Sequence, residues 1–195
     1  MKLLIHTMIL VVVSLFLAPS GTDCQTNQFQ KYLASLRILN TPLRFDCVTK
    51  IHCDFQREVD TILTIRFKPK DTYFVGGVFP EARFVALIFA YPGSSAPYPS
   101  LYTFTHTGKP IDTLFLPCTC ESDEEYGENY VTLINADQTI SILDTLAHRK
   151  VDENGEPVPG INLTTIDESK YRITANGRIE KLGSYNHTVP ESDSK

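Results

Sequence analysis

The sequence predicts an all-β protein, an antiparallel meander of about eight or nine strands with one short N-terminal helix, closed as a barrel or folded as a sandwich. Three observations lead to this class. From residue 59 onward, apolar residues alternate with polar ones or form short continuous runs, as they do in strands. Turn-forming residues separate these runs. A helical spacing of apolar residues occurs in one segment, close to the N-terminus.

Residues 1–23 are predicted to form a secretory signal peptide. Lys2 gives the start a positive charge, and an apolar run follows from residue 8 to residue 17. This run is too short for a bilayer, which needs about 20 apolar residues, and Pro19-Ser20-Gly21 ends it. Cleavage is expected between about residues 18 and 24. The mature protein is therefore expected in the periplasm, at the outer membrane or outside the cell.

Residues 24–188 are predicted to form a single β-rich domain, because this length builds one core but not two. Residues 189–195 are expected to be a disordered tail. The formal net charge of −5 means that the chain lacks the basic excess needed to bind nucleic acids or anionic membranes. Membrane contact is expected only through a lipid on Cys24, although Asp23 departs from the residue usual beside a lipidation site.

One helical pattern follows the predicted signal. Its apolar residues fall at i, i+3, i+4 and i+7, namely Phe29, Tyr32, Leu33 and Leu36. Asn27 and Gln30 are placed as a capping pair, and Asn40-Thr41-Pro42 ends the segment. We expect this helix to cover one end or face of a sheet.

The later apolar runs predict the strands. They are Val59–Phe67, Tyr73–Phe79, Arg83–Tyr91, Leu101–Thr105, Ile111–Leu116, Tyr130–Asn135, Thr139–Leu143, Tyr171–Thr174 and Arg178–Leu182. The segment from Phe84 to Ala90 is apolar at every position, which predicts a central strand covered on both sides. Gly76-Gly77 indicates a bulge or bend.

Three segments repeat one plan: Tyr, an alternating strand, a short polar turn, then Ile and a second strand. They begin at Tyr102, Tyr130 and Tyr171, and each is predicted to be a hairpin. The turns are expected at Thr107-Gly108, Asp137-Gln138 and Asn176-Gly177. Their irregular spacing favours a meander over a solenoid.

The cysteines are Cys24, Cys47, Cys53, Cys118 and Cys120. In an exported chain, disulfides are the first expectation. Cys118 and Cys120 would lie too far apart on one strand face to bond with each other, so we predict bridges from both to the segment of Cys47 and Cys53, with the pairing open. The alternatives are free thiols, or four thiolates around zinc with His52 in reserve, although the cysteine spacings depart from the usual zinc pattern.

The acidic run from Glu121 to Glu128 follows these cysteines. It is predicted to be a solvated loop, and a calcium site is the alternative because like charges this close repel unless a cation lies among them. We predict no cofactor and no resident metal.

The helix "FQKYLASLRILNTPLRF" behind a signal, together with hairpins such as "YTFTHTGKPIDTL", resembles the small uncharacterised exported β-rich envelope proteins of Bacteroidota. Many proteins of that kind resemble lipoproteins, and Asp23 departs from their signature here. The resemblance implies a cell-envelope location and carries no activity with it.

The loop "AYPGSSAPYPSLY" is the predicted binding element, through Tyr91, Tyr98 and Tyr102. Tyrosines among prolines give rigid aromatic surface, which suits recognition of a protein, peptide or glycan, and the alternative is a loop that covers a sheet edge. No nucleophile elbow, metalloprotease or phosphate-loop motif is present in the sequence.

The leading functional prediction is therefore a non-enzymatic binding or structural domain. The alternative is a secreted hydrolase whose site is assembled from distant strands. Its candidate residues are His106, Asp112, Glu121, Asp123, Asp144 and His148.

Overall fold

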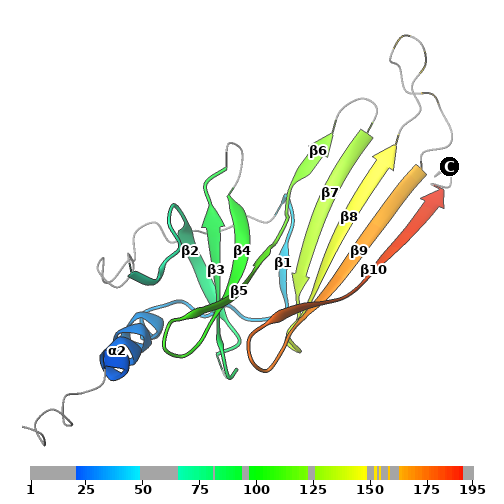
Figure 1. The fold of residues 1–195 in the computed structure, drawn as a ribbon. Helices are drawn as coiled ribbons and strands as arrows, with labels where there is room; N and C mark the ends of the chain where they lie inside the picture. The colour runs from blue at the N-terminus through cyan, green and yellow to red at the C-terminus, as the bar shows by residue number, and fades with distance from the viewer. Residues whose placement is uncertain are drawn as a thin grey trace, which may run out of the picture.

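The computed structural model describes residues 21–48, 66–80, 82–93, 97–122, 126–148, 152, 154, 158 and 163–190. Within these residues the predicted fold class is confirmed. Ten strands form two antiparallel sheets that pack as a sandwich, with one N-terminal helix (Figure 1). No helix in this part of the chain combines the length and the apolar character needed to cross a bilayer.

The smaller sheet is a four-stranded meander in the order β2-β3-β4-β5. Its strands are β2 (Tyr73–Val78), β3 (Val85–Tyr91), β4 (Tyr98–Phe104) and β5 (Pro110–Phe115). The larger sheet has the order β1-β7-β8-β9-β10, and β6 also pairs with β7. Its strands are β1 (Leu43–Phe45), β6 (Cys120–Ser122), β7 (Tyr126–Ile134), β8 (Thr139–His148), β9 (Leu163–Ile173) and β10 (Ile179–Pro190).

The main core lies between the two sheets. Ile88 and Leu101 from the smaller sheet and Ile134 and Ile140 from the larger one are completely buried in it. Burying each such side chain stabilises the fold by about 1.5–3 kcal/mol. β3 contributes to this core through alternate residues, and its other residues are buried on the opposite face. The prediction of a strand covered on both sides is thus confirmed.

The helix α2 (Gly21–Ala34) covers the outer face of the four-stranded sheet. Phe29 is completely buried and lies 4.9 Å from the ring of Phe67 and 5.9 Å from the ring of Phe104. Leu87 and Phe89 of β3 complete this second, aromatic core. The amphipathic pattern correctly predicted the helix and its role as a cover. The predicted capping pair was wrong, because the helix begins at Gly21 and Asn27 and Gln30 lie inside it, and Leu36 follows its end.

After α2 the chain runs beside β2. Leu39 donates its N–H to Gly77 O at 2.8 Å, and Gly77 donates its N–H to Arg37 O at 2.8 Å. The predicted bulge is present, because the pairing of β2 with β3 shifts between Phe74 and Gly76. A Cβ at Gly76 would lie 2.3 Å from Leu39 Cγ, so the glycine is needed for this close approach.

Several boundaries differ from the prediction. Arg66 and Phe67 form a helical turn where a strand was expected to end, and residues 59–65 lie outside the described part. β1 and β6 were not predicted, because three residues are too few to show a period. β10 continues to Pro190 and so includes the first two residues of the expected tail, of which residues 191–195 are outside the described part.

The three repeated hairpins are confirmed, and their turns share one hydrogen-bond pattern. In each turn, a backbone N–H donates to the carbonyl oxygen of the residue three positions earlier. The donors are Gly108, Gln138 and Gly177, at 2.9, 3.1 and 2.8 Å. All three have left-handed backbone angles, with φ of 82°, 67° and 83°. The turn therefore demands a positive φ at one position, which glycine meets in two hairpins and glutamine in the third.

This shared turn predicts opposite effects for two matched substitutions. Gly177→Ala should lower the free energy of unfolding by about 1–2 kcal/mol, because alanine disfavours the left-handed region, and its Cβ would lie 3.0 Å from Phe84 Cβ. Gln138→Gly should raise it by about 0.5–1 kcal/mol, because the left-handed penalty is removed. Urea denaturation measures both, and changes of the same sign would contradict the shared geometry.

Candidate functional site

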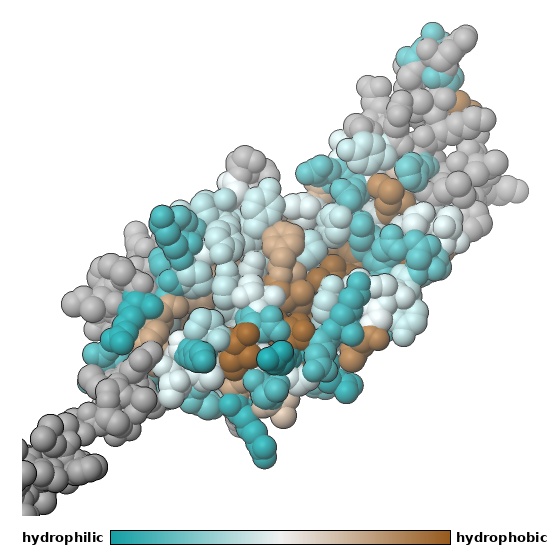
Figure 2. All heavy atoms as spheres, viewed as in Figure 1, coloured by the Kyte–Doolittle hydropathy of each residue, from teal (hydrophilic) through white to brown (hydrophobic). Residues whose placement is uncertain are grey.

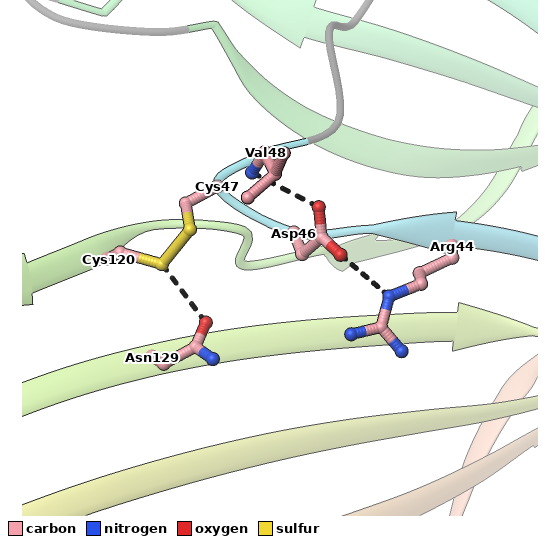
Figure 3. The surroundings of a disulfide bond; sticks show 6 residues. All are labelled: Arg44, Asp46, Cys47, Val48, Cys120 and Asn129. Carbon is pink, nitrogen blue, oxygen red and sulfur yellow. Dashed lines mark hydrogen bonds and ion pairs between the residues drawn. A yellow bond between two sulfur atoms is a disulfide. The ribbon is translucent and has the colours of Figure 1, made fainter.

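A disulfide bond joins the two short strands that lie end to end along one edge of β7. Cys47 follows β1, Cys120 begins β6, and their Cα atoms are 5.4 Å apart (Figure 3). β1 pairs with residues 132–134 of β7 and β6 pairs with residues 127–129. Between them Tyr130 donates its N–H to Thr119 O at 2.9 Å. The bond therefore holds together an edge that is built from two distant segments.

Polar contacts surround this bond (Figure 3). Arg44 Nε lies 2.6 Å from Asp46 Oδ2, and Asp46 Oδ1 accepts the N–H of Val48 at 3.1 Å. Asn129 Oδ1 lies 3.1 Å from Cys120 Sγ. The contacts of Asp46 fix the turn that carries Cys47, and pairing of β6 with β7 places Cys120 opposite Asn129.

The prediction for Cys118 was wrong. The thiol is free and the residue is only 5% exposed, in the core with Leu116 and Phe45. Residues 116–119 are not part of a strand, so the rule that residues two apart share a face does not apply to Cys118 and Cys120. Burial, and then the charge of Asp46, raises the pKa of the Cys118 thiol, which keeps it protonated and unreactive.

Two other cysteines and the proposed metal sites complete this comparison. Cys53 lies outside the described part, and so does the side chain of Cys24. Among the described residues, no group of three or more His, Cys, Asp or Glu side chains is arranged to hold a metal ion. Glu121 belongs to β6, so the start of the expected acidic loop is a strand, and residues 123–125 are outside the described part.

Removing the disulfide should destabilise the protein markedly. The bond closes a separation of 73 residues, and in the chain-entropy account a loop of that size is worth about 4 kcal/mol. The variant Cys47→Ser/Cys120→Ser should therefore unfold at much lower urea concentration than the wild type. Reductant should shift the wild type to the same midpoint and leave the variant unchanged, and Cys118→Ser serves as the control that keeps the bond. Equal urea midpoints for this variant and the oxidised wild type would contradict a stabilising role for the disulfide.

The predicted tyrosines are brought together with one residue that sequence analysis missed. Tyr91 and Tyr98 are directly paired across β3 and β4, and the hydroxyls of Tyr91 and Tyr102 lie 2.6 Å apart. The rings of Tyr98 and Phe115 are 6.4 Å apart. We call Tyr91, Tyr98, Tyr102 and Phe115 the aromatic patch. Phe115 joins because Ser100 pairs with it, which places it on the tyrosine side of the sheet.

The aromatic patch lies beyond the part of the sheet that α2 covers. Tyr91 is 37% exposed and Phe115 is 50% exposed, whereas Phe89 beside them is completely buried. The ring of Tyr102 packs on Phe89 at 5.5 Å and on Phe104 at 6.3 Å. Burial, and then the hydrogen bond to Tyr91, raises the pKa of Tyr102, so this hydroxyl stays protonated at neutral pH. The patch is thus rigid at its base and accessible at its surface.

A row of polar residues crosses the larger sheet. It lies on the same face as the core residues Ile134 and Ile140. It consists of Tyr130, Asp144, Asp167 and Asn186, which are paired in that order. Asn186 Nδ2 donates to Asp167 Oδ1 at 2.6 Å, and Tyr130 donates to Glu128 Oε1 at 2.9 Å. Asp144 Oδ1 is buried with no hydrogen-bond partner among the described residues. Burial raises the pKa of Asp144, Tyr130 lowers it, and the nearby Glu128 and Asp167 raise it further.

This raised pKa predicts a pH effect. Asp144 binds a proton more tightly in the folded state than in the unfolded state. Its contribution to the free energy of unfolding is therefore most favourable below the ordinary pKa of 3.8, and it is lost as the pH rises through the pKa of Asp144 in the folded state. Asp144→Asn should therefore stabilise the protein near pH 7, by less than about 1 kcal/mol given the exposure of the site. The gain should vanish near pH 3, as measured by urea denaturation at both pH values.

Asp137 provides the control of opposite sign. Hydrogen bonds from the Thr139 hydroxyl and backbone N–H lower the pKa of Asp137. Asp137→Asn should therefore destabilise the protein near pH 7 and have little effect at low pH. A pH profile for Asp144→Asn that matches the one for Asp137→Asn would refute the account given for Asp144.

The candidate residues of a hydrolase are dispersed. Asp112 Oδ2 accepts the N–H of Ile179 at 2.9 Å and so links the two sheets. His106 lies at the turn between β4 and β5, and His148 is exposed at the end of β8. Glu121 is on the edge strand β6 and Asp144 is in the polar row, while Asp123 is outside the described part. Neither of the two pockets described next is lined by more than one of these candidates.

Two neighbouring pockets lie between α2, β2 and the turn that joins β7 to β8. The first is about 300 Å³ and is mainly apolar, and of the hydrolase candidates described it contains His106 alone. The second is about 510 Å³ and is more polar. Ile38, Phe79 and Pro80 line both pockets. Phe79 has φ of 55°, an unusual angle for a bulky residue, and nothing in the sequence predicted it.

The described residues define an all-β protein of two packed antiparallel sheets with a disulfide at one edge and an aromatic patch on the smaller sheet. A disulfide is typical of a non-reducing compartment, such as the one that exported proteins enter. Comparison with protein-family models, curated proteins and solved structures finds no match to the chain.

Proposed function

We propose that the protein is exported after loss of residues 1–23 and acts in the bacterial cell envelope as a non-enzymatic binding protein. The envelope location is the one implied by the resemblance to exported β-rich proteins of Bacteroidota, which carries no activity with it. The binding surface is the aromatic patch. The disulfide supports the location, since such bonds persist outside reducing compartments. The dispersed hydrolase candidates give no support to the enzymatic alternative.

The observation that carries the proposal is the partial exposure of four aromatic rings held by three neighbouring strands. Their positions come from strand pairing, so the surface is formed before a ligand arrives and little side-chain entropy is lost on binding. In Figure 2, apolar side chains are visible over β5 and the boundary between the two sheets. The aromatic patch itself is defined by its exposed rings, Tyr91 at 37% and Phe115 at 50%.

The composition of the patch selects the class of ligand. Its residues offer ring faces and hydroxyl groups and no charged side chain. Rings bind the apolar faces of a ligand, and hydroxyls exchange hydrogen bonds with neutral polar groups. Glycans combine both features, so a neutral glycan is the ligand that the patch fits best.

Binding to an array of neutral glycans, followed by calorimetry on the hits, tests this proposal. Tyr98→Ala and Phe115→Ala should each weaken binding about 10-fold or more, as expected for central aromatic contacts. Tyr185→Ala is the matched control, because Tyr185 is an exposed ring on the other sheet, and it should leave the affinity unchanged. Binding that survives both patch substitutions, or selective binding to charged peptides, would overturn the proposal.

A further inference from the structure

The outer edge of β10 is open along most of its length. β10 is the last strand of the larger sheet, and no other strand of the described residues pairs with this edge (Figure 1). Its beginning is occupied, because Ile179 donates its N–H to Asp112 Oδ2. A bulge between Lys181 and Gly183 then separates this beginning from a second half that pairs with residues 163–170 of β9. The open part is therefore the segment from residue 184 to residue 189.

The other sheet edges carry features that prevent pairing with a second chain. Residues 37–39 lie against β2, and Pro110, which has no N–H, begins β5. The edge beside β7 is divided into two three-residue strands with a disulfide between them. Short strands, proline and covering segments are the usual protections of an edge. β10 is 12 residues long and lacks such protection between its bulge and Pro190.

The composition of the open segment suits contact with an identical strand. No Asp, Glu, Lys or Arg occurs from Leu182 to Pro190, although the whole chain has a net charge of −5. Two acidic copies can therefore approach along this edge without direct charge repulsion. Tyr185 is 58% exposed and Val189 is 45% exposed, and both point to the same face as His187 between them.

We propose that β10 pairs with β10 of a second copy of this chain, antiparallel about a two-fold axis, so that the two larger sheets join into one. A two-fold pairing keeps side chains on the same face, so residues of the same parity must oppose each other. With the axis at His187, Tyr185 of each copy lies opposite Val189 of the other. This register covers the exposed apolar side chains in aromatic–aliphatic cross-strand pairs.

The interface is a single strand pair, so the dimer is expected to be weak and to depend on concentration. Light scattering behind size-exclusion chromatography, on the mature oxidised protein over a dilution series, should show the mass rise from one chain toward two. A mass of one chain at every concentration would overturn the proposal, leaving the edge for a strand of another protein.

Charge variants test the register. Tyr185→Lys/Val189→Lys places lysines opposite each other in both pairs, so this variant should be monomeric at concentrations at which the wild type is dimeric. Tyr185→Glu/Val189→Glu should likewise be monomeric, and an equal mixture of the two variants should form a heterodimer. Both altered side chains are exposed, so folding should be retained, as circular dichroism can verify.

Phe115→Lys provides the control on the other sheet. It should abolish glycan binding and leave the dimer intact, which separates failure of this proposal from failure of the proposed function. A dimer that resists both charged β10 variants, or that is lost with Phe115→Lys, would show that another surface forms it. Lysine and glutamate variants that fail to associate when mixed would overturn the register.

Discussion

The burial of β3 on both faces is the constraint on which the rest of the structure depends. Ile88 faces the larger sheet and Phe89 faces α2, and both are completely buried. A strand with this composition is stable only if a layer covers each side, so the second sheet and the helix are both required. The helix covers only part of the outer face. The aromatic patch is the remainder of that face, and its partial exposure follows from the length and position of α2.

Much of the fold could be predicted because its signals are local. Phe29 and Tyr32 revealed the helix by their spacing, and Gly177 revealed a hairpin by the backbone angle that only glycine adopts easily. The site was less predictable, since it depends on contacts between distant segments. Phe115 enters the patch only through the register of β5 on β4, and Cys118 turned inward because the chain leaves the strand conformation before it. A disulfide between the segment of Cys47 and the segment of Cys120 was predicted correctly. The structure was needed to show that Cys47 pairs with Cys120.

The two sheets differ in what their residues are used for. The smaller sheet is covered on one face and partly on the other, and its exposed residues include Tyr91 and Phe115 as well as Thr113. The larger sheet extends beyond the smaller one (Figure 1), and there its core-side face carries the polar row of Tyr130, Asp144 and Asp167. Burial, and then the neighbouring carboxylates of Glu128 and Asp167, raise the pKa of Asp144, so the ionised side chain lowers the free energy of unfolding at neutral pH. Local losses of stability of this kind are common at surfaces that serve a function other than packing the core.

The disulfide has a mechanical consequence. The segment between Cys47 and Cys120 contains every strand of the smaller sheet, from β2 to β5. If tension is applied between α2 and β10, the load passes from Cys47 to Cys120 through the sulfur bridge and bypasses these strands. While the disulfide is intact, force does not extend the segment between Cys47 and Cys120. The maximum extension of the chain is therefore shorter by the length of that segment. Reduction would add that hidden length to the extensible chain and expose the smaller sheet to the pulling force.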